Sequence, residues 1–193
     1  MPQMTQPQEI QIYQIKITLL YTRPPIWRRV EVPSHIYLAD LHQIIQIVME
    51  WTESHLWEVH DKNKTYSDPK YFDEFDDIEI VDSKKMKLFD VLKRAKSKII
   101  YVYDFGDDWE HEVVLEKKFP PEIDVDYPRC TDGKLACPPE DCGGINGFYR
   151  MLECLSDPDD EEYESMKEWV GEGYNPEYFD IEGVNKALKK LKM

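Results

Sequence analysis

The pattern of residues 99 to 115 constrains the fold of this chain most strongly. Every second position is apolar or aromatic at Ile99, Tyr101, Tyr103 and Phe105, the same spacing recurs at Trp109, His111, Val113 and Leu115, and Gly106-Asp107-Asp108 lies between the two runs. Alternation with period two is typical of a strand with one buried face, and a short Gly-Asp segment between two strands favours a hairpin. The pattern predicts that Glu110 and Glu112 face solvent or a polar partner. It predicts burial of Trp109, His111, Val113 and Leu115.

Residues 10 to 33 predict a second hairpin, followed by a helix. Residues 10 to 22 have the alternation of a strand, and the apolar parity changes near Tyr13-Gln14, which indicates a bulge. Pro24-Pro25 separates this strand from a partner over 27 to 32. Apolar residues then recur with helical spacing at Leu38, Leu41, Ile45 and Val48.

The rest of the chain predicts shorter elements. A strand is expected over 55 to 60 and a short helix over 88 to 95. Residues 120 to 147 are rich in Pro, Gly and Cys, which predicts an irregular stretch. Of three C-terminal helices, the second should begin at Asp157-Pro158 and end at Gly171 or Gly173, and the last should begin near Asp180.

These elements predict an α+β fold. We expect a mixed, curled sheet built from the two hairpins and packed on the first helix, in a β-grasp-like arrangement, with a C-terminal helical portion. The predicted organisation is an N-terminal tail (1–9) and a single domain (10–193). Within that domain we expect a sheet-rich part (10–119), a Cys/Pro/Gly loop (120–147) and a helical part (148–193).

Net charge restricts the partners. The 193 residues include 39 Asp or Glu and 24 Lys or Arg, for a formal net charge of −15. Such a field repels phosphate backbones and anionic membranes, so we expect no direct nucleic-acid binding and no membrane association.

The N-terminal residues lack the basic and apolar runs of a secretory signal, and four cysteines without an export signal indicate free thiols or a metal site. We therefore expect a cytoplasmic protein.

Three segments together resemble a known family. The first is Pro25-Ile26-Trp27-Arg28-Arg29-Val30 followed by Leu38-Ala39-Asp40-Leu41-His42, and the second runs from Tyr103 to His111. The third is Tyr127-Pro128-Arg129-Cys130, leading to residues 136 to 144 and Gly147. These segments resemble the plasmid pRiA-type ORF-three-like family, whose members are described as transposon-resolvase-related passenger proteins. The resemblance implies an association with mobile elements and no defined activity.

The resolvase description does not fit the residues of this chain. A serine recombinase needs a nucleophilic serine in an arginine-rich pocket and a basic DNA-binding tail. None of the serines here follows a strand with an arginine cluster nearby, and the region from Asp157 to Tyr163 is acidic. We therefore expect that the protein is not a recombinase. The chain also departs from the family at Trp57, where the family often carries a histidine beside the equivalent of His55.

The cysteines offer one candidate metal site. Cys130, Cys137 and Cys142 have the spacing C-x6-C-x4-C within the loop, and Cys154 or His111 could supply a fourth zinc ligand. This spacing is looser than the C-x2-C pairs of typical zinc sites. The alternatives are that the thiols are small buried residues that pack the loop against the core, or that two of them form a disulfide. We favour packing and assign no metal ligand here.

A second candidate lies at the turn of the central hairpin. The acids from Asp104 to Glu110, together with His111, could hold a hard cation such as Mg²⁺. Regular alternation, however, points Asp104 and His111 to opposite faces of the hairpin. His111 is then more simply a core histidine, and acids suit a tight turn without a metal.

The resulting functional hypothesis is a non-enzymatic binding or accessory protein of mobile-element origin, which would act through an unknown protein partner. No nucleophile, base and orienting residue converge in the sequence, so no catalytic residue and no cofactor are assigned. The alternative is a metal-dependent enzyme or structural zinc protein that uses the Cys130/Cys137/Cys142 loop or the Asp104–His111 turn. The acids over 73 to 82 are expected to form an exposed, mobile segment.

Overall fold

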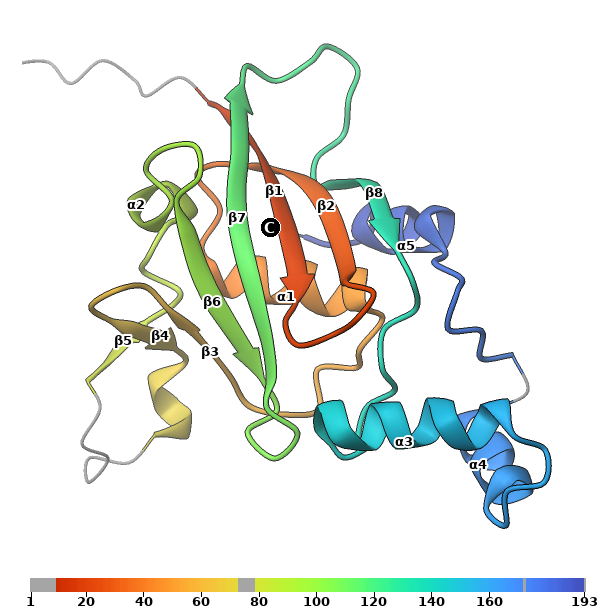
Figure 1. The fold of residues 1–193 in the computed structure, drawn as a ribbon. Helices are drawn as coiled ribbons and strands as arrows, with labels where there is room; N and C mark the ends of the chain where they lie inside the picture. The colour runs from red at the N-terminus through yellow and green to blue at the C-terminus, as the bar shows by residue number, and fades with distance from the viewer. Residues whose placement is uncertain (1–9, 73–78, 172, 193) are drawn as a thin grey trace, which may run out of the picture.

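A computed structural model describes residues 10–72, 79–171 and 173–192, which form an eight-stranded sheet with helices around it (Figure 1). The predicted tail (1–9) and residues 73 to 78 of the predicted acidic segment lie outside the described residues. In chain order the elements are β1 (Ile12–Leu19), β2 (Ile26–Pro33), α1 (Leu38–Met49), β3 (Trp57–His60), β4 (Thr65–Ser67), a 3₁₀ turn (Pro69–Tyr71), β5 (Ile80–Asp82), α2 (Leu88–Val91), β6 (Lys98–Tyr103), β7 (Trp109–Phe119), β8 (Arg129–Lys134), α3 (Gly144–Ser156), α4 (Tyr163–Val170) and α5 (Ile181–Leu188).

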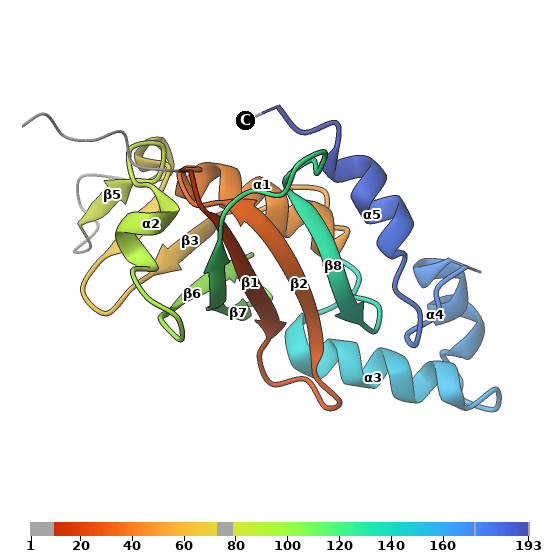
Figure 2. The same cartoon turned by 90° about the horizontal axis from the view of Figure 1, so that it is seen from above.

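The sheet confirms the predicted α+β class. Its strand order is β5-β4-β3-β6-β7-β1-β2-β8, with β4 and β5 parallel and the other described neighbours antiparallel. Seen from above, the strands curve around α1 without closing into a barrel (Figure 2). The sheet contains more strands than the two predicted hairpins supply, and its strand order does not by itself establish the β-grasp arrangement.

Both predicted hairpins are present. β1 pairs with β2, and the register between β1 and β7 shifts at Gln14/Ile15, where the sequence predicts a bulge. β6 pairs with β7 from Lys98 opposite Val114 to Tyr103 opposite Trp109. The four residues predicted to be buried on β7 have no exposed surface, because they face α1 across the core. Glu110 and Glu112 lie on the other face and are half-buried.

A buried arginine joins the helix to the sheet. Arg28 has no exposed surface, and its Nε donates to the carbonyl of Val48, 2.8 Å away in the last turn of α1. Its Nη1 donates to the carbonyl of Lys134 at the end of β8, and its guanidinium lies 3.7 Å from the centre of the Phe179 ring. The C-terminal end of a helix carries partial negative charge, which compensates the buried cation. Arg28 thus joins α1, β8 and the segment before α5.

The predicted irregular stretch over 120 to 147 is wrong in part, because it contains β8. This strand pairs with the free edge of β2, with Val30 opposite Cys130 and a register shift after Arg29. An open strand edge presents unpaired backbone groups, and pairing them outweighs the low strand propensity of a Thr-Asp-Gly sequence. α3 also begins within this stretch, at Gly144.

Two helices differ from their predicted bounds. α4 begins at Tyr163 rather than at Asp157-Pro158, because the carboxylates of Asp157 and Asp160 accept hydrogen bonds from the backbone N–H groups of Asp159 and Glu162 and form turns instead. It ends at Gly171, as predicted, and α5 begins after Asp180, which caps it. α2 spans four residues instead of the predicted 88 to 95.

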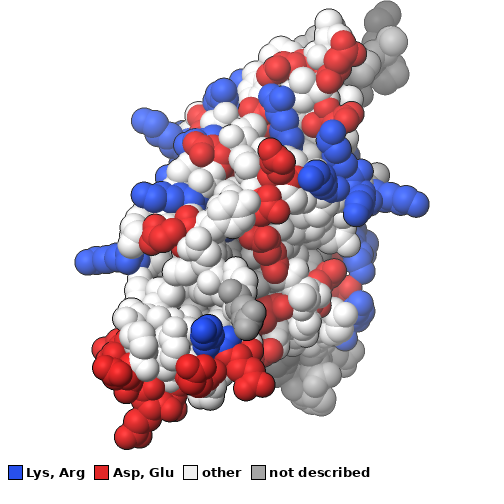
Figure 3. All heavy atoms as spheres, turned by 90° about the vertical axis from the view of Figure 1, so that its right-hand side faces the viewer, with Lys and Arg blue, Asp and Glu red and all other residues white. Residues whose placement is uncertain are grey.

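The described surface is acidic at one end. Figure 3 shows acidic side chains gathered at the lower end of the face that carries α3 and α4. Glu161, Glu162, Glu164 and Glu168 of this region are exposed, which agrees with a solvated face. Among the described residues, no helix has the length and apolar character that a membrane crossing requires.

Candidate metal site

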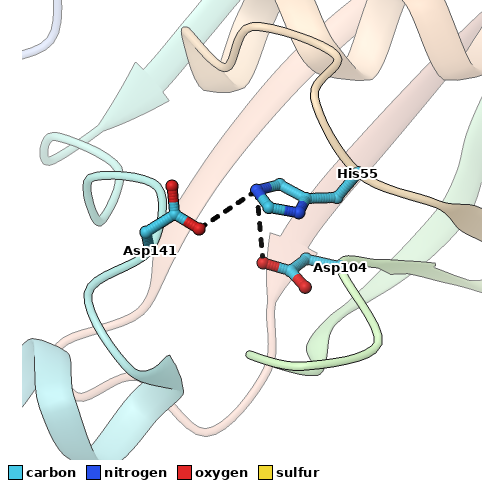
Figure 4. Close-up of side chains that lie close together, drawn as sticks. All are labelled: His55, Asp104 and Asp141. Atoms are coloured by element: carbon cyan, nitrogen blue, oxygen red, sulfur yellow. Dashed lines mark ion pairs between the residues drawn. The ribbon is translucent and has the colours of Figure 1, made fainter.

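Three side chains from separate parts of the chain converge near the turn between β6 and β7 (Figure 4). His55 comes from the loop between α1 and β3, Asp104 follows β6, and Asp141 lies between β8 and α3. The His55 Nε2 atom lies 3.2 Å from Asp141 Oδ1 and 3.6 Å from Asp104 Oδ2. One ligand atom of each residue lies within 4.8 Å of the other two. We call these three residues the His/Asp cluster.

Backbone geometry positions Asp104. Its φ of 58° is left-handed, which Asp adopts more readily than most residues, and its N–H donates to the carbonyl of Leu56 at 2.8 Å. Its Oδ1 accepts a hydrogen bond from the N–H of Gly106 at 2.9 Å, within the turn itself. Because Oδ1 is used locally, Oδ2 is the oxygen that faces His55. The turn therefore both shapes the hairpin and directs a carboxylate oxygen into the cluster.

Tyr103 positions the loop that carries His55. Its hydroxyl accepts hydrogen bonds from the N–H groups of Ser54 at 3.0 Å and His55 at 3.3 Å, and donates to Glu140. Burial and the Glu140 carboxylate hold the pKa of Tyr103 above its usual value, so the hydroxyl stays protonated as a donor. Glu140 also accepts from the N–H of Thr52 at 3.0 Å. One hydroxyl and one carboxylate therefore connect all three segments.

The loop before α3 carries Asp141. Asp141 follows Glu140, has a φ of 59°, and its side chain is 73% exposed. The N–H of Gly143 donates to Asp107 Oδ2 at 3.2 Å, which ties this loop to the hairpin turn. A Cβ atom at Gly144 would lie 2.6 Å from the carbonyl oxygen of Asp107, so only glycine fits there at a φ of 65°. The loop and the turn are thus packed backbone to backbone.

The electrostatics of the cluster favour a cation. Asp104 is buried, and among the described residues neither Asp104 nor Asp141 forms an ion pair with Lys or Arg. The Nε2 atom of His55 is shielded from solvent and makes no hydrogen bond with a described residue. The buried carboxylate of Asp104 needs a compensating charge, which either a protonated His55 or a bound cation supplies, and an imidazole nitrogen beside two carboxylate oxygens is a metal-ligand atom.

The spacing of the three atoms also suits a metal ion. Bonds of about 2.1 Å to N and O ligands place neighbouring ligand atoms roughly 3.0 to 3.5 Å apart. The distances of 3.2 and 3.6 Å from His55 Nε2 to the two carboxylate oxygens are close to that range. One imidazole and two carboxylates form a mixed donor set, which suits a divalent transition-metal ion such as Zn²⁺ or Mn²⁺.

A groove lies beside the cluster. It has a volume of about 510 Å³, and its lining includes His55, His42, Glu53, Trp57 and Tyr71. Because His55 belongs to both, an ion at the cluster could use its open coordination positions on the groove side. The cluster and the groove together form a site that could take both a metal and a small ligand.

His42 presents a defined donor at this groove. Its Nδ1 lies 2.8 Å from the hydroxyl of Tyr101, which accepts a hydrogen bond from the Gln46 amide at 3.0 Å. Gln46 Oε1 accepts from the N–H of Glu53 at 2.9 Å, which fixes the orientation of the amide. Tyr101 therefore donates to Nδ1, and the Nε2 atom of His42 carries the proton. Burial lowers the pKa of His42 to about 3, so the ring is neutral.

Trp57 and Glu53 complete the surroundings of His42. The rings of His42 and Trp57 stack at 4.2 Å between centroids and 8° between planes, which fixes the imidazole against β3. The Nε2 atom of His42 lies 3.3 Å from Glu53 Oε1 without a hydrogen bond to a described residue. Trp57 thus forms an aromatic wall of the groove.

The cysteines named as zinc candidates lie apart from this cluster. Cys130, Cys137 and Cys154 are buried, Cys142 is half-buried, and all four are free thiols. Cys137 contacts Met49 and lies 3.6 Å from the Arg28 guanidinium. Burial raises the pKa of Cys130 and Cys137 to about 11 and that of Cys142 to about 12, so these thiols are protonated and unreactive at neutral pH without a metal. In the described parts of the chain, the His/Asp cluster is the group of three or more candidate ligands that converges.

His111, the other candidate ligand, lies in the core. It has no exposed surface, its Nδ1 lies 3.0 Å from the carbonyl oxygen of Trp109, and the edge of its ring faces Trp51. Burial lowers its pKa to about 3. The structure therefore separates Asp104 from His111 and brings Asp104 to His55 and Asp141 instead.

Sequence reasoning missed His55 and Asp141 as partners of Asp104. The signal was present, because Asp104 and Asp141 lie within the segments that carry the family resemblance, and His55 lies in the segment where the chain departs from it. Joining them requires knowing that the loop before α3 folds back onto the β6–β7 turn. That contact spans more than thirty residues and leaves no local pattern.

The fold and the cluster define a class: α+β proteins with a curled mixed sheet and a His/Asp cluster at one end of its central hairpin. The chain belongs to the family of plasmid pRiA4b ORF-3-like proteins, which matches residues 11–183. It is 34% identical over 182 residues to the uncharacterised protein y4hQ of Sinorhizobium fredii, covering 93% of this chain and 92% of that protein. It is also similar to the crystal structure of MM3350, a protein of unknown function from Methanosarcina mazei, with 39% identity, a TM-score of 0.80 and coverage of 91% and 98% of the two chains.

Proposed function

We propose that this protein is a metal-dependent binding protein that holds a divalent transition-metal ion at His55, Asp104 and Asp141. The observation that carries the proposal is the convergence of one imidazole nitrogen and two carboxylate oxygens from three separate segments. Two carboxylates and a neutral imidazole leave a charge of −2, which a divalent ion neutralises. The proposal departs from the sequence expectation, which assigned no metal ligand.

Three protein ligands leave coordination positions open. Asp141 is largely exposed and His55 lines the groove, so these positions are accessible from solvent. An ion held this way binds an oxygen-containing ligand through its open positions, while the Nε2–H of His42 and the ring of Trp57 contact the ligand in the groove. Two of the three family segments, 103–111 and 136–144, then supply the two carboxylate ligands.

A binding role is favoured over a nucleophilic enzyme by the residues that line the groove. Its hydroxyl-bearing residues are Ser54 and Tyr71, and Ser54 Oγ lies 2.7 Å from Thr52 Oγ1 rather than beside an imidazole. An activated serine requires an adjacent base. This supports the non-enzymatic role expected from the sequence.

Isothermal titration calorimetry with Zn²⁺ and Mn²⁺ tests the proposal on protein stripped with EDTA. Asp104→Asn and Asp141→Asn are suitable variants, because Asn tolerates the left-handed conformation at both positions. Each should weaken ion binding at least about 100-fold, since each removes a charged ligand. Asp124→Asn is the matched control, because Asp124 is also left-handed and exposed but lies in the loop between β7 and β8. Equal affinities for all three variants, or no ion binding by the native protein, would refute the proposal.

A metal-dependent enzyme is the second candidate, and one observation favours it. The Glu53 carboxylate lines the groove beside the cluster and could take a proton from a metal-bound water. Hydrolysis of aryl phosphate and aryl ester probes by the Mn²⁺-loaded protein would support this candidate. Glu53→Gln should then remove turnover while ion binding persists.

The origin of the protein, its compartment and its lack of DNA binding are also part of the proposal. The plasmid in the family's name supports a mobile-element origin. The net charge of −15 supports a protein that does not bind duplex DNA directly, and the proposed compartment is the cytoplasm. Electrophoretic mobility shift assays with duplex DNA at physiological salt would test the nucleic-acid expectation, which micromolar binding would contradict.

A further inference from the structure

A pocket with a positive lining lies at the end of the sheet opposite the His/Asp cluster. It has a volume of about 600 Å³ and is formed by the start of β1, the turn after β2, the α2 segment and the end of β7. Its lining includes Lys87, Lys93, Lys118 and His35 and no described carboxylate. We call it the lysine pocket.

The backbone around this pocket is fixed by hydrogen bonds. The N–H of Phe89 donates to the carbonyl of Ser34 at 3.0 Å, and the N–H of Ser34 donates to the carbonyl of Gln11 at 2.8 Å. Lys118 pairs with Tyr13 across β7 and β1. The segments that carry the lysines are therefore held together before any ligand arrives.

Neutral groups, not carboxylates, position two of the ammonium groups. Lys118 Nζ donates to the carbonyl oxygen of Lys93 at 2.7 Å and lies 4.7 Å from the centre of the Tyr13 ring. Lys87 Nζ lies 5.7 Å from the centres of both the Tyr37 and the Phe89 rings. An ammonium group has three N–H donors, so these contacts leave donors free to bind an anion.

The lysines of the pocket differ from four others in the described chain that have carboxylate partners. Lys70, Lys84, Lys85 and Lys98 each form an ion pair with a carboxylate. None of the described carboxylates forms an ion pair with Lys87, Lys93 or Lys118, although acids outnumber bases by 39 to 24 in the chain. Three positive charges around one cavity repel each other, and a multiply charged anion relieves this repulsion.

We infer that the lysine pocket binds a small phosphate ester. The lysines supply charge-assisted hydrogen bonds to the phosphate oxygens. The pocket also contains Ile10, Tyr13 and Phe89, which suit an apolar or aromatic group, and its volume lies within the range of small-ligand sites. Free phosphate would leave the apolar part of the pocket unused, so the ester is the better fit.

Calorimetric titrations of the full chain with inorganic phosphate and with adenosine monophosphate test this inference. The monophosphate ester should bind more tightly than inorganic phosphate, and both should weaken as salt is raised. Lys87→Met and Lys118→Met should each weaken ester binding about tenfold or more, since each removes a charge-assisted contact. Two separate variants are used because Lys118 also contacts the backbone of Lys93.

Lys117→Met is the matched control, because Lys117 neighbours Lys118 on β7 and faces the other side of the sheet, outside the pocket. Its affinity for the ester should stay within about twofold of the native value, because general charge effects of a single exposed residue are small. The inference is overturned if Lys117→Met weakens binding as much as Lys118→Met, or if neither anion binds at millimolar concentration. Tighter binding of duplex DNA than of the ester through the same lysines would also overturn it.

Discussion

The two ends of strand β7 carry sites of opposite charge that are built in different ways. At the Trp109 end, the three segments that carry His55, Asp104 and Asp141 are held by hydrogen bonds from backbone N–H groups to the Tyr103 hydroxyl and to aspartate side chains. At the Phe119 end, roughly 30 Å away for eleven strand residues, ammonium groups are held by a carbonyl oxygen and aromatic rings. The first end is suited to a cation and the second to an anion.

This difference shows what net charge does and does not determine. A charge of −15 governs long-range attraction and repulsion, and it underlies the expectation of no DNA binding. It does not predict a local pocket, because a ligand in a pocket responds to the charges within a few ångströms. Asp104 and Asp141 lie within the family segments, whereas Lys87, Lys93 and Lys118 lie outside all of them.

Acid should have the largest effect, because it lowers the free energy of unfolding through two histidines at the cluster end. The buried, neutral histidines His42 and His111 lie at the cluster end, and their pKa values of about 3 are below the unfolded value of about 6.5. Below pH 6.5 the unfolded state therefore binds more protons than the native state, and the free energy of unfolding falls as the pH falls. The expected loss between pH 6.5 and 5 is up to about 4 kcal/mol for the two histidines together.

Urea unfolding at several pH values measures this loss. His111→Leu should remove about half of the slope, because one titrating group is gone, and Lys118→Met should leave the slope unchanged. A His111→Leu slope equal to that of the native protein would contradict the assignment of a neutral core histidine.

The Gly144→Ala variant should weaken ion binding at the His/Asp cluster and leave ester binding at the lysine pocket unchanged. Its new Cβ would meet the carbonyl oxygen of Asp107 at 2.6 Å, at a φ of 65° that alanine disfavours. We expect a loss of about 3 kcal/mol in the free energy of unfolding and weaker ion binding, because the loop that carries Asp141 must move. Gly173→Ala is the control, since nothing lies within 4 Å of that position. Ester binding at the lysine pocket should be the same in both variants, and a selective loss there would contradict the separation of the ends.

The Tyr103→Phe variant removes one hydroxyl from the cluster end and leaves the rest of the side chain in place. That hydroxyl connects the His55 loop to Glu140, so its loss should cost about 2 kcal/mol of stability and weaken ion binding about tenfold. Tyr178→Phe is the matched control, because Tyr178 is 60% exposed and lies outside the cluster. Equal ion affinities in the two variants would show that Tyr103 does not position the cluster.

The Cys137→Ala variant should give the smallest effect. Cys137 packs against Met49, so its truncation leaves a small cavity and lowers the free energy of unfolding by about 1 to 2 kcal/mol. Ion binding at the cluster should be unchanged, and EDTA should not unfold the native protein. Loss of bound zinc in Cys137→Ala, or unfolding by EDTA, would favour a structural site at the cysteines.

The sequence predicted the parts of the fold that local patterns encode. The alternation of residues 99 to 115 gave the central hairpin with its buried face, and the parity change near Gln14 gave the bulge in β1. β8 was missed because its Thr-Asp-Gly sequence has no strand pattern and forms only against the edge of β2. The start of α4 was misplaced because side-chain hydrogen bonds from Asp157 and Asp160 compete with helix formation.

The candidate site was only partly predictable. Asp104 was recognised among the acids of the turn, but its partners come from loops that meet only in the folded protein. His111 was favoured as a core residue from its place in the alternation, and the structure places it there. The lysine pocket left no pattern at all, because its lysines are separated by up to thirty residues and are brought together by the sheet.

Crystals grown with Mn²⁺ and measured at a wavelength where manganese scatters anomalously give the most direct test of the metal site. A strong anomalous peak is expected about 2.2 Å from His55 Nε2 and from one oxygen of each of Asp104 and Asp141. The same peak should be absent in Asp104→Asn crystals. A native map without a peak at the cluster, or with its strongest protein-bound peak at the cysteines, would contradict a metal site at His55, Asp104 and Asp141.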